Sequence, residues 1–328
     1  MCSNRPKRQQ RGAALIVALV VVAIVAILSV TVSSDFLLMF RRVENQMYSE
    51  QAYAYLLGAE GVARVALLKD QKLAPDVDTL VEDWALPQKF PTDYGWIAGQ
   101  LEDMQGRFNL NLLTKPPTAG ETHSEQQRLL IRLLQALPLA EPLALDQAEA
   151  LVDAISDWID SDDTPSRLGG AESQYYADAD PPGRPANRAL KSPSELMWVK
   201  GMTPEIYRAL APFVTVWPQD PKAGSGININ TAPAVVLRCI NDKGSLEPLD
   251  PSTTEKILEQ RKSRGEIDIG VYTENEVPSP DQSFVAVKST YFQLTAQTEF
   301  QGRQYTLRSV ILRDEKNIRV IARTFGEW

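Results

Sequence analysis

Histidine and cysteine are scarce in this chain, and their scarcity excludes several kinds of active site. Among 328 residues there is one histidine, His123, and there are two cysteines, Cys2 and Cys239. A mechanism that needs several imidazoles is therefore excluded, as are a disulfide framework and a cysteine-rich zinc site. We expect His123 to lie at the surface near a helix start and Cys239 to be a small buried apolar residue. The composition indicates a protein that is not an enzyme.

A surplus of basic residues is also missing. The chain has 34 Lys and Arg against 42 Asp and Glu, for a formal net charge of -8. A protein that binds nucleic-acid backbones needs a basic surface, so this balance argues against that class. The fractions of hydrophobic residues (44%) and charged residues (23%) are those of an ordinary globular protein.

The first 32 residues join a short basic segment to a long apolar one. Residues 1–12 contain four basic residues and no acidic one, and residues 13–32 contain neither a charge nor a proline. About twenty apolar residues, at ~1.5 Å each, match a hydrocarbon core of roughly 30 Å. The basic flank predicts that this end stays in the cytoplasm, which places the bulk of the chain in the periplasm as a single-pass inner-membrane protein.

Three interpretations of this segment compete. A cleaved secretory signal peptide would have a shorter apolar run followed by small residues, whereas this run ends in Val30-Thr31-Val32. A plain membrane anchor would keep residues 1–12. A leader cut between Gly12 and Ala13, ahead of the apolar run, is the third interpretation. The basic leader, its terminal glycine and the long apolar stretch resemble the type IV prepilin pattern.

The residues that follow favour the third interpretation. No proline occurs between Ala13 and Pro75, and after Asp35 apolar residues recur at helical spacing with charged residues between them. We predict one helix over 13–74 that spans the membrane over 13–32 and is amphipathic beyond. Pilins and pseudopilins usually begin with phenylalanine and carry glutamate as their fifth mature residue, whereas this chain has Ala13 and Val17 at these positions.

The remainder predicts an α+β protein in which helices interrupt a sheet. We expect short strands at 84–85 and 94–101, later strands at 284–288, 291–300, 304–312 and 317–324, and a hairpin turn at 301–303. Helices are expected over 124–137, 145–159, 194–210 and 253–264. The predicted units are a leader (1–12), the helix (13–74), the start of a sheet (75–108), an inserted helical domain (109–215), a second helical unit (216–277) and C-terminal strands (278–328).

A weak internal repeat runs through the inserted helices. Phe108-Asn109-Leu110-Asn111 begins one unit and Ile227-Asn228-Ile229-Asn230 begins the other, with asparagines that suit turns or helix caps. The units are similar to helix-hairpin-helix or SAM-like domains. DNA-binding hairpins use a Gly-x-Gly turn, but the first hairpin has only Gly201 and the second, at 241–245, has no such turn. A protein-interaction domain is favoured, and a membrane-anchored DNA-binding protein of competence type is the alternative.

These features in their order along the chain resemble the K-type minor pseudopilins of type II secretion. The K type characteristically lacks the glutamate that Val17 replaces, because a subunit at a filament tip has no neighbour whose amine needs a carboxylate. The resemblance also rests on the leader, on the helical insertion, and on these stretches: Asp157-Trp158-Ile159-Asp160-Ser161-Asp162, Gly170-Ala171-Glu172-Ser173-Gln174-Tyr175-Tyr176, Ser194-Glu195-Leu196 with Val199-Lys200-Gly201-Met202, and Ile229-Asn230-Thr231-Ala232.

The resemblance implies both a fold and a function. The fold would be a pilin fold, with the N-terminal helix packed on a C-terminal antiparallel sheet and a large inserted domain. The chain would be cleaved by prepilin peptidase, methylated, and assembled as a hetero-oligomer that caps the pseudopilus, helping to initiate its assembly and protein export across the outer membrane. Its partners would be the I-type and J-type minor pseudopilins, the major pseudopilin and the inner-membrane assembly platform.

An acidic segment lies in the insertion. Between residues 153 and 180 there are eight carboxylates, opposed only by Arg167. On a helix Asp153, Asp157 and Asp160 would share one face and repel each other unless a cation joined them. Oxygen ligands without histidine or cysteine favour calcium. The segment begins like an EF-hand at Asp160, but a proline stands where the invariant glycine belongs.

K-type pseudopilins bind calcium in the corresponding loop, so the resemblance implies a structural calcium site here. Asp160, Asp162 and Glu172 are the leading candidate ligands. The other candidates are Asp157, Asp163, Asp178 and Asp180. A solvated acidic loop without metal is the alternative.

Overall fold

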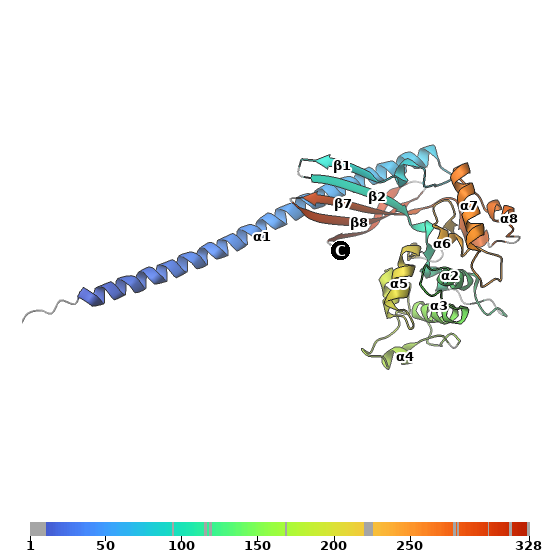
Figure 1. The fold of residues 1–328 in the computed structure, drawn as a ribbon, viewed down its shortest axis with the longest axis horizontal. Coiled ribbons are helices and arrows are strands. Elements are labelled where there is room, and N and C mark those ends of the chain that lie inside the picture. The colour runs from blue at the N-terminus through green and yellow to red at the C-terminus, as the bar shows by residue number, and fades with distance from the viewer. Residues whose placement is uncertain are drawn as a thin grey trace, which may run out of the picture.

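One helix dominates the computed structural model, which describes residues 11–93, 95–114, 117, 120–167, 169–219, 226–277, 280, 282–300, 302–314 and 317–326. Helix α1 (Arg11–Leu73) has 63 residues, and at ~1.5 Å per residue it is roughly 95 Å long. Its first half projects away from the rest of the molecule (Figure 1). The predicted helix is confirmed, and it ends two residues before Pro75. Residues 1–10 of the expected leader lie outside the described residues.

The first half of α1 is exposed and apolar. Within the part of the chain that the structure describes, α1 is the one helix long and apolar enough to cross a membrane, and none of its most apolar stretch is buried in the protein. Its second half is amphipathic, because Ala52, Leu56, Ala63 and Leu67 follow one another at helical spacing and are buried.

The buried face of α1 packs on a five-stranded antiparallel sheet of order β1-β2-β7-β8-β9. Along β7 buried side chains alternate with partly exposed ones, as a sheet covered on one face requires. The predicted α+β pilin arrangement is confirmed. The strands are β1 (Gln88–Thr92), β2 (Gly95–Asp103), β7 (Tyr291–Phe300), β8 (Arg303–Arg313) and β9 (Ile318–Gly326).

Two strand predictions are wrong. The segment at 84–85 belongs to a 3₁₀ helix, η1 (Asp83–Ala85), in which Trp84 packs edge-on against Phe292 under the sheet. The strand expected at 284–288 shrinks to β6 (Val285–Ala286), which pairs with β5 (Ile227–Asn228) instead of joining the large sheet. Tyr94 and Gln301, which we expected in a strand and in the hairpin turn, lie outside the described residues.

The two helical units lie together at the end of the sheet, beyond β2 and β7, and are called the inserted domain from here on (Figure 1). Ser124 begins α2 with a capping box, and Asp250 caps α7. Helices α2 and α3 pack together over a large apolar core. The remaining elements are η2 (Met104–Gly106), β3 (Phe108–Asn109), η3 (Leu110–Thr114), α2 (Glu125–Gln135), α3 (Leu145–Ile159), α4 (Ser173–Ala177), η4 (Pro193–Trp198), α5 (Pro204–Leu210), η5 (Ala211–Phe213), β4 (Val214–Thr215), α6 (Ala234–Leu237), α7 (Pro251–Arg264), α8 (Gly270–Glu274) and η6 (Gln282–Phe284).

The repeat seen in the sequence has a structural counterpart. Strand β3 pairs in parallel with β4, and β5 pairs in parallel with β6. The second asparagine of each motif closes its unit: Asn111 accepts the N–H of Leu190 at 2.7 Å, and Asn230 accepts the N–H of Ile267 at 2.7 Å. Each also donates to the carbonyl oxygen of that same residue, at 3.0 Å. The same pair of asparagine hydrogen bonds therefore stabilises each of the two helical units.

Candidate metal centre

The acidic segment folds into a loop between α3 and α4. Asp157, in the last turn of α3, accepts backbone N–H groups from Ser166 at 3.0 Å and from Ala171 at 2.8 Å, which turns the chain back onto the helix. Gly170 permits this approach, since a Cβ atom there would lie 2.3 Å from Asp157 Oδ2. Asp160 is the C-terminal cap residue of α3, and Glu172 is the N-terminal cap residue of α4.

This loop brings three carboxylates together. Oxygen atoms of Asp157, Asp160 and Glu172 all lie within 4.8 Å of one another. The Glu172 side chain is only 3% exposed, and neither of its oxygens has a hydrogen-bond partner; Asp160 Oδ1 has none either. A buried carboxylate without a partner is costly, so these atoms point to a ligand that is not part of the chain.

The electrostatics of the loop agree with that inference. Burial, followed by the neighbouring aspartates, raises the pKa of Glu172 to about 7. Burial and the charges of Asp162 and Asp157 raise the pKa of Asp160 to about 6. Three acidic groups that repel one another in a poorly hydrated space bind a divalent cation well, because the cation removes the repulsion. Their hard oxygen atoms suit calcium.

The other four predicted ligands lie outside this cluster, in two pairs. Asp162 and Asp163 are exposed in the same loop, where they accept the backbone N–H groups of Thr164 and Ser173 respectively. Asp178 and Asp180 are exposed at or beyond the end of α4 and are not part of the cluster. Asp178 instead accepts a hydrogen bond from Gln174 at 2.7 Å.

Two neighbours of the cluster differ from the sequence-based expectation. Asp153, which we expected on the face of Asp157 and Asp160, pairs with Arg167 and so has its own counter-ion. His123, expected at the surface, is buried beside α3 with Nε2 3.2 Å from Glu149 Oε1, so that prediction is wrong. Burial and the nearby arginines Arg167 and Arg128 lower the pKa of His123 to about 4, so it is neutral. Arg167 also donates to the carbonyl oxygen of Thr122 at 2.7 Å, which ties the segment before α2 to the acidic loop.

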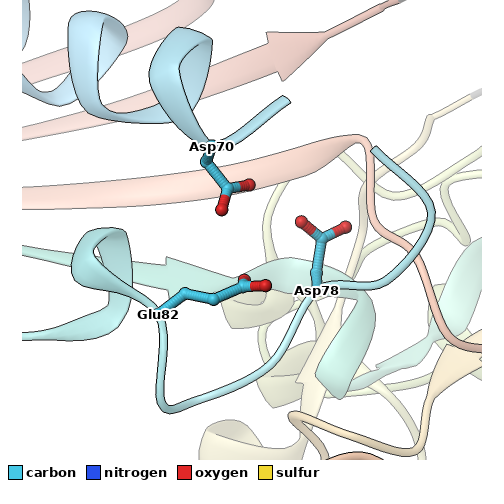
Figure 2. Close-up of side chains that lie close together, drawn as sticks. All are labelled: Asp70, Asp78 and Glu82. Carbon is cyan, nitrogen blue, oxygen red and sulfur yellow. The ribbon is translucent and has the colours of Figure 1, made fainter. Parts of the chain in front are cut away.

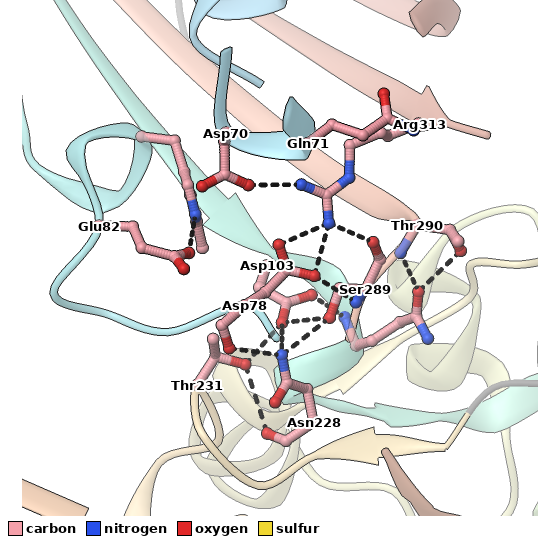
Figure 3. Close-up of polar contacts among 12 residues, drawn as sticks. Asp70, Gln71, Asp78, Glu82, Asp103, Asn228, Thr231, Ser289, Thr290 and Arg313 are labelled. Carbon is pink, nitrogen blue, oxygen red and sulfur yellow. Dashed lines mark hydrogen bonds and ion pairs between the residues drawn. The ribbon is translucent and has the colours of Figure 1, made fainter. Parts of the chain in front are cut away.

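A second acidic cluster, which no sequence pattern singled out, lies at the end of α1. Figure 2 shows the carboxylates of Asp70, Asp78 and Glu82 directed toward a common space. Figure 3 shows why a cation is not needed there: Arg313 donates to both Asp70 and Asp78. Glu82 accepts the indole N–H of Trp84 at 2.6 Å. These carboxylates have internal partners, in contrast to Glu172.

Beside this second cluster, Asp103 forms a joint between the sheet and the insertion. Asp103, at the end of β2, accepts hydrogen bonds from Ser289 at 2.6 Å, Thr231 at 2.6 Å and Asn228 at 3.0 Å (Figure 3). Asn228 also donates to the carbonyl oxygen of Asp78 at 3.1 Å. A buried and satisfied polar network of this kind fixes how two parts of a protein are oriented.

Comparison with known proteins gives a consistent result. A family model described as "Type II secretion system (T2SS), protein K" matches residues 106–219. The chain is 32% identical to the type II secretion system protein K of Pseudomonas aeruginosa over 98% of this chain and 94% of that protein. It is also 30% identical to the protein of the same name from Aeromonas hydrophila, over 96% of this chain and 97% of that protein.

A solved structure is similar as well. The fold matches a chain in the crystal structure of the GspK-GspI-GspJ complex from the enterotoxigenic Escherichia coli type 2 secretion system, with a TM-score of 0.68 and 26% identity. The match covers 88% of this chain and 100% of that one.

Proposed function

The chain belongs to the type II secretion system protein K family, and we propose that it is the minor pseudopilin that caps the tip of the pseudopilus. There it would help to initiate pseudopilus assembly and protein export across the outer membrane. One observation carries the proposal: the inserted domain lies at the end of the molecule opposite the membrane-spanning half of α1 (Figure 1). A subunit within a filament needs a free surface for the next subunit, and this bulk leaves no room for one above it.

The amino-terminal half of α1 supports assembly through its apolar surface. Beyond the membrane-spanning stretch, Phe36, Met39, Phe40 and Met47 are exposed on the helix. Apolar surface of that extent is buried when helices associate. We propose that it packs against the helices of the I-type and J-type pseudopilins, in line with the GspK-GspI-GspJ complex that the fold resembles.

The location and processing of the chain follow from the same proposal. Cleavage between Gly12 and Ala13 by prepilin peptidase, followed by methylation, releases the basic leader and leaves α1 anchored in the inner membrane with the rest of the chain in the periplasm. The assembly platform and the major pseudopilin then act on the processed subunit. Val17 suits a tip position, because a carboxylate there would lie in the membrane without a partner amine.

Calcium is the cofactor that we propose for the inserted domain. Asp157, Asp160 and Glu172 would hold it, with Asp162 and Asp163 near enough to strengthen the field. The ion's role would be structural: it would tie the end of α3 to the start of α4 across a loop with little apolar content. The chain's own contribution is the fold of the loop, which Asp157 fixes through two backbone N–H groups.

Gold labelling of assembled pseudopili tests the tip position. An epitope after β9 is used to label the full chain in cells that express the complete secretion system. We expect label at one end of each pseudopilus and a mature chain that begins at Ala13 by N-terminal sequencing. Label along the shaft, or a chain that begins at Met1, would contradict the proposal. The competence-type alternative predicts salt-dependent retention of DNA by the full chain in detergent, which we do not expect.

A further inference from the structure

A groove beside α4 gathers the exposed aromatic side chains of the inserted domain. Tyr175 is 46% exposed, Met197 40% and Trp198 66%, and all three line one groove of about 660 Å³. Among the described residues from 100 to 300, Leu145 is the one other large apolar side chain that is exposed. Exposed apolar side chains are ordinary when scattered, but a cluster that lines a concave surface marks an interaction site.

The groove is firmly built. Its floor is the buried ring of Tyr176, which packs edge-on against Trp158 with the ring centroids 5.0 Å apart. The Tyr176 hydroxyl accepts the backbone N–H of Lys200 at 3.2 Å and so connects the two walls. One wall is α4 with the residues after it, and the other is the stretch from Met197 to Gly201. These contacts hold the two walls of the groove together.

The charge of the groove is opposite to that of the chain as a whole. Lys200 Nζ lies 5.1 Å from the centre of the Tyr175 ring and donates to the carbonyl oxygens of Gly169 and Gly170. Arg184 also lines the groove and is exposed. Within the described part of the chain neither cation is ion-paired with a carboxylate, whereas Arg188 is paired with Glu195. The lining also contains Asp180 and the paired Glu195, so the groove carries three cations and two carboxylates. This small positive excess, on a chain of net charge -8, favours a partner with a carboxylate.

We propose that this groove is a docking site for a protein segment that presents an aromatic or aliphatic side chain next to a carboxylate. Tryptophan, tyrosine, methionine and arginine are the residue types enriched at the centres of protein interfaces, and all four line this groove. The apolar side chain enters between Tyr175 and Trp198, and the carboxylate meets Arg184 and Lys200. The site lies at the end of the domain far from α1 (Figure 1), so docking and assembly through α1 are compatible.

The candidate metal centre supports one wall of the groove. Glu172 directly precedes α4 without a capping hydrogen bond, and Tyr175 follows it by one turn. Lys200 binds the carbonyl oxygens of Gly169 and Gly170 in the loop that Asp157 holds. Asp157, Asp160 and Glu172 would hold a cation at the base of the wall that carries Tyr175, and this support for the wall rests on the calcium site proposed above. This inference does not depend on the tip position, since it concerns the inserted domain alone.

A random-peptide phage library tests the docking site. The library is selected on the full chain in detergent with calcium, and the selected peptides are measured by fluorescence anisotropy. We expect enrichment of peptides with an aromatic or aliphatic residue beside Asp or Glu. Trp198→Ser should weaken their binding about tenfold or more, as truncation of a central interface residue does. Leu145→Ala, an exposed apolar residue outside the groove, should leave binding unchanged.

Exchanging the charges of Arg184 and of the peptide's acidic residue distinguishes specific docking from nonspecific hydrophobic binding. Arg184→Glu should weaken the selected peptides, and replacing the peptide's acidic residue with lysine should restore binding to that variant but not to the parent chain. Removal of calcium should also weaken binding. The proposal is overturned if no acidic apolar motif is enriched, if Trp198→Ser and Leu145→Ala behave alike, or if the chain forms a dimer that Trp198→Ser dissolves, which would make the groove a self-association surface.

Discussion

Arg313 on β8 and Asp78 in the segment after α1 form a buried ion pair, although 235 residues separate them along the chain. The same guanidinium donates to Asp70 at the end of α1 and to the carbonyl oxygen of Ser289. Because Asp78 also meets Asn228 of the insertion, one arginine links the helix, the sheet and the inserted domain. Orientation of the insertion relative to α1 therefore depends on it.

Arg313→Met should destabilise the chain severely. Asp70 and Asp78 would stay buried without their counter-ion, and removal of one partner from a buried pair costs about 3–5 kcal/mol. Urea unfolding of the full chain in detergent, followed by tryptophan fluorescence, measures the loss. Lys69→Met removes an exposed pair with Asp83 and should change the free energy of unfolding by less than about 1 kcal/mol. Equal losses in the two variants would contradict a role for the buried joint.

Glu172→Gln should abolish stabilisation by calcium. A ligand that binds only the folded chain stabilises it by about 2.7 kcal/mol at a concentration one hundred times its dissociation constant. We expect calcium to raise the melting temperature of the parent chain and of Asp178→Asn, whose carboxylate lies outside the cluster. The melting temperature of Glu172→Gln should not respond. Differential scanning calorimetry of the full chain, with calcium or with chelator, measures these melting temperatures. An equal response to calcium in all three chains would refute the proposed ligands.

Without calcium the stability of the chain should fall as the pH rises. Burial raises the pKa of Glu172 to about 7, above its ordinary 4.5, so the folded state holds a proton that the unfolded chain releases. This contribution is complete below the unfolded pKa and is lost as the pH passes through about 7. Asp70, whose pKa burial and Glu82 raise to about 7, acts in the same direction.

Melting temperatures in chelator from about pH 8 to about pH 6 measure this dependence. We expect the melting temperature to rise on acidification, and Glu172→Gln to remove part of the rise while Asp70 and Asp160 maintain the rest. Excess calcium should suppress the contribution of Glu172, since the ion competes with the proton. A parent chain in chelator that becomes less stable between these pH values on acidification would contradict the assignment.

Local patterns in the sequence predicted the regular elements well. The helix over 145–159 and the strand over 291–300 have the predicted bounds, because helical or alternating apolar spacing sets each of them within one segment. The segment at 84–85 failed for the opposite reason. The position of Trp84 is set by its contacts with Phe292 and Glu82. A segment of two residues is too short for a periodic pattern that would distinguish a strand from a 3₁₀ helix.

The two acidic clusters show which part of a site the sequence can reveal. The cluster of Asp157, Asp160 and Glu172 lies within one loop, so the density of charge pointed to it. The sequence still ranked Asp162 above Asp157, because only the folded loop shows Asp157 at its centre. The joint around Arg313 draws on segments from residue 70 to residue 313, and its long-range partners leave no local signal.

Val17→Glu tests the meaning of the missing carboxylate at the amino end of α1. An unpaired acidic side chain costs about 2.5–3.5 kcal/mol at the centre of a membrane-spanning stretch and less near its ends, and at the proposed tip position no subunit above offers it an amine. We expect less cross-linking of the variant to the I-type and J-type pseudopilins and less export of secreted protein, while Val17→Leu behaves like the parent chain. N-terminal sequencing checks that both variants are cut after Gly12, as we expect. If Val17→Glu instead assembles normally and appears along the shaft, residue 17 and not the inserted domain restricts this subunit to the tip.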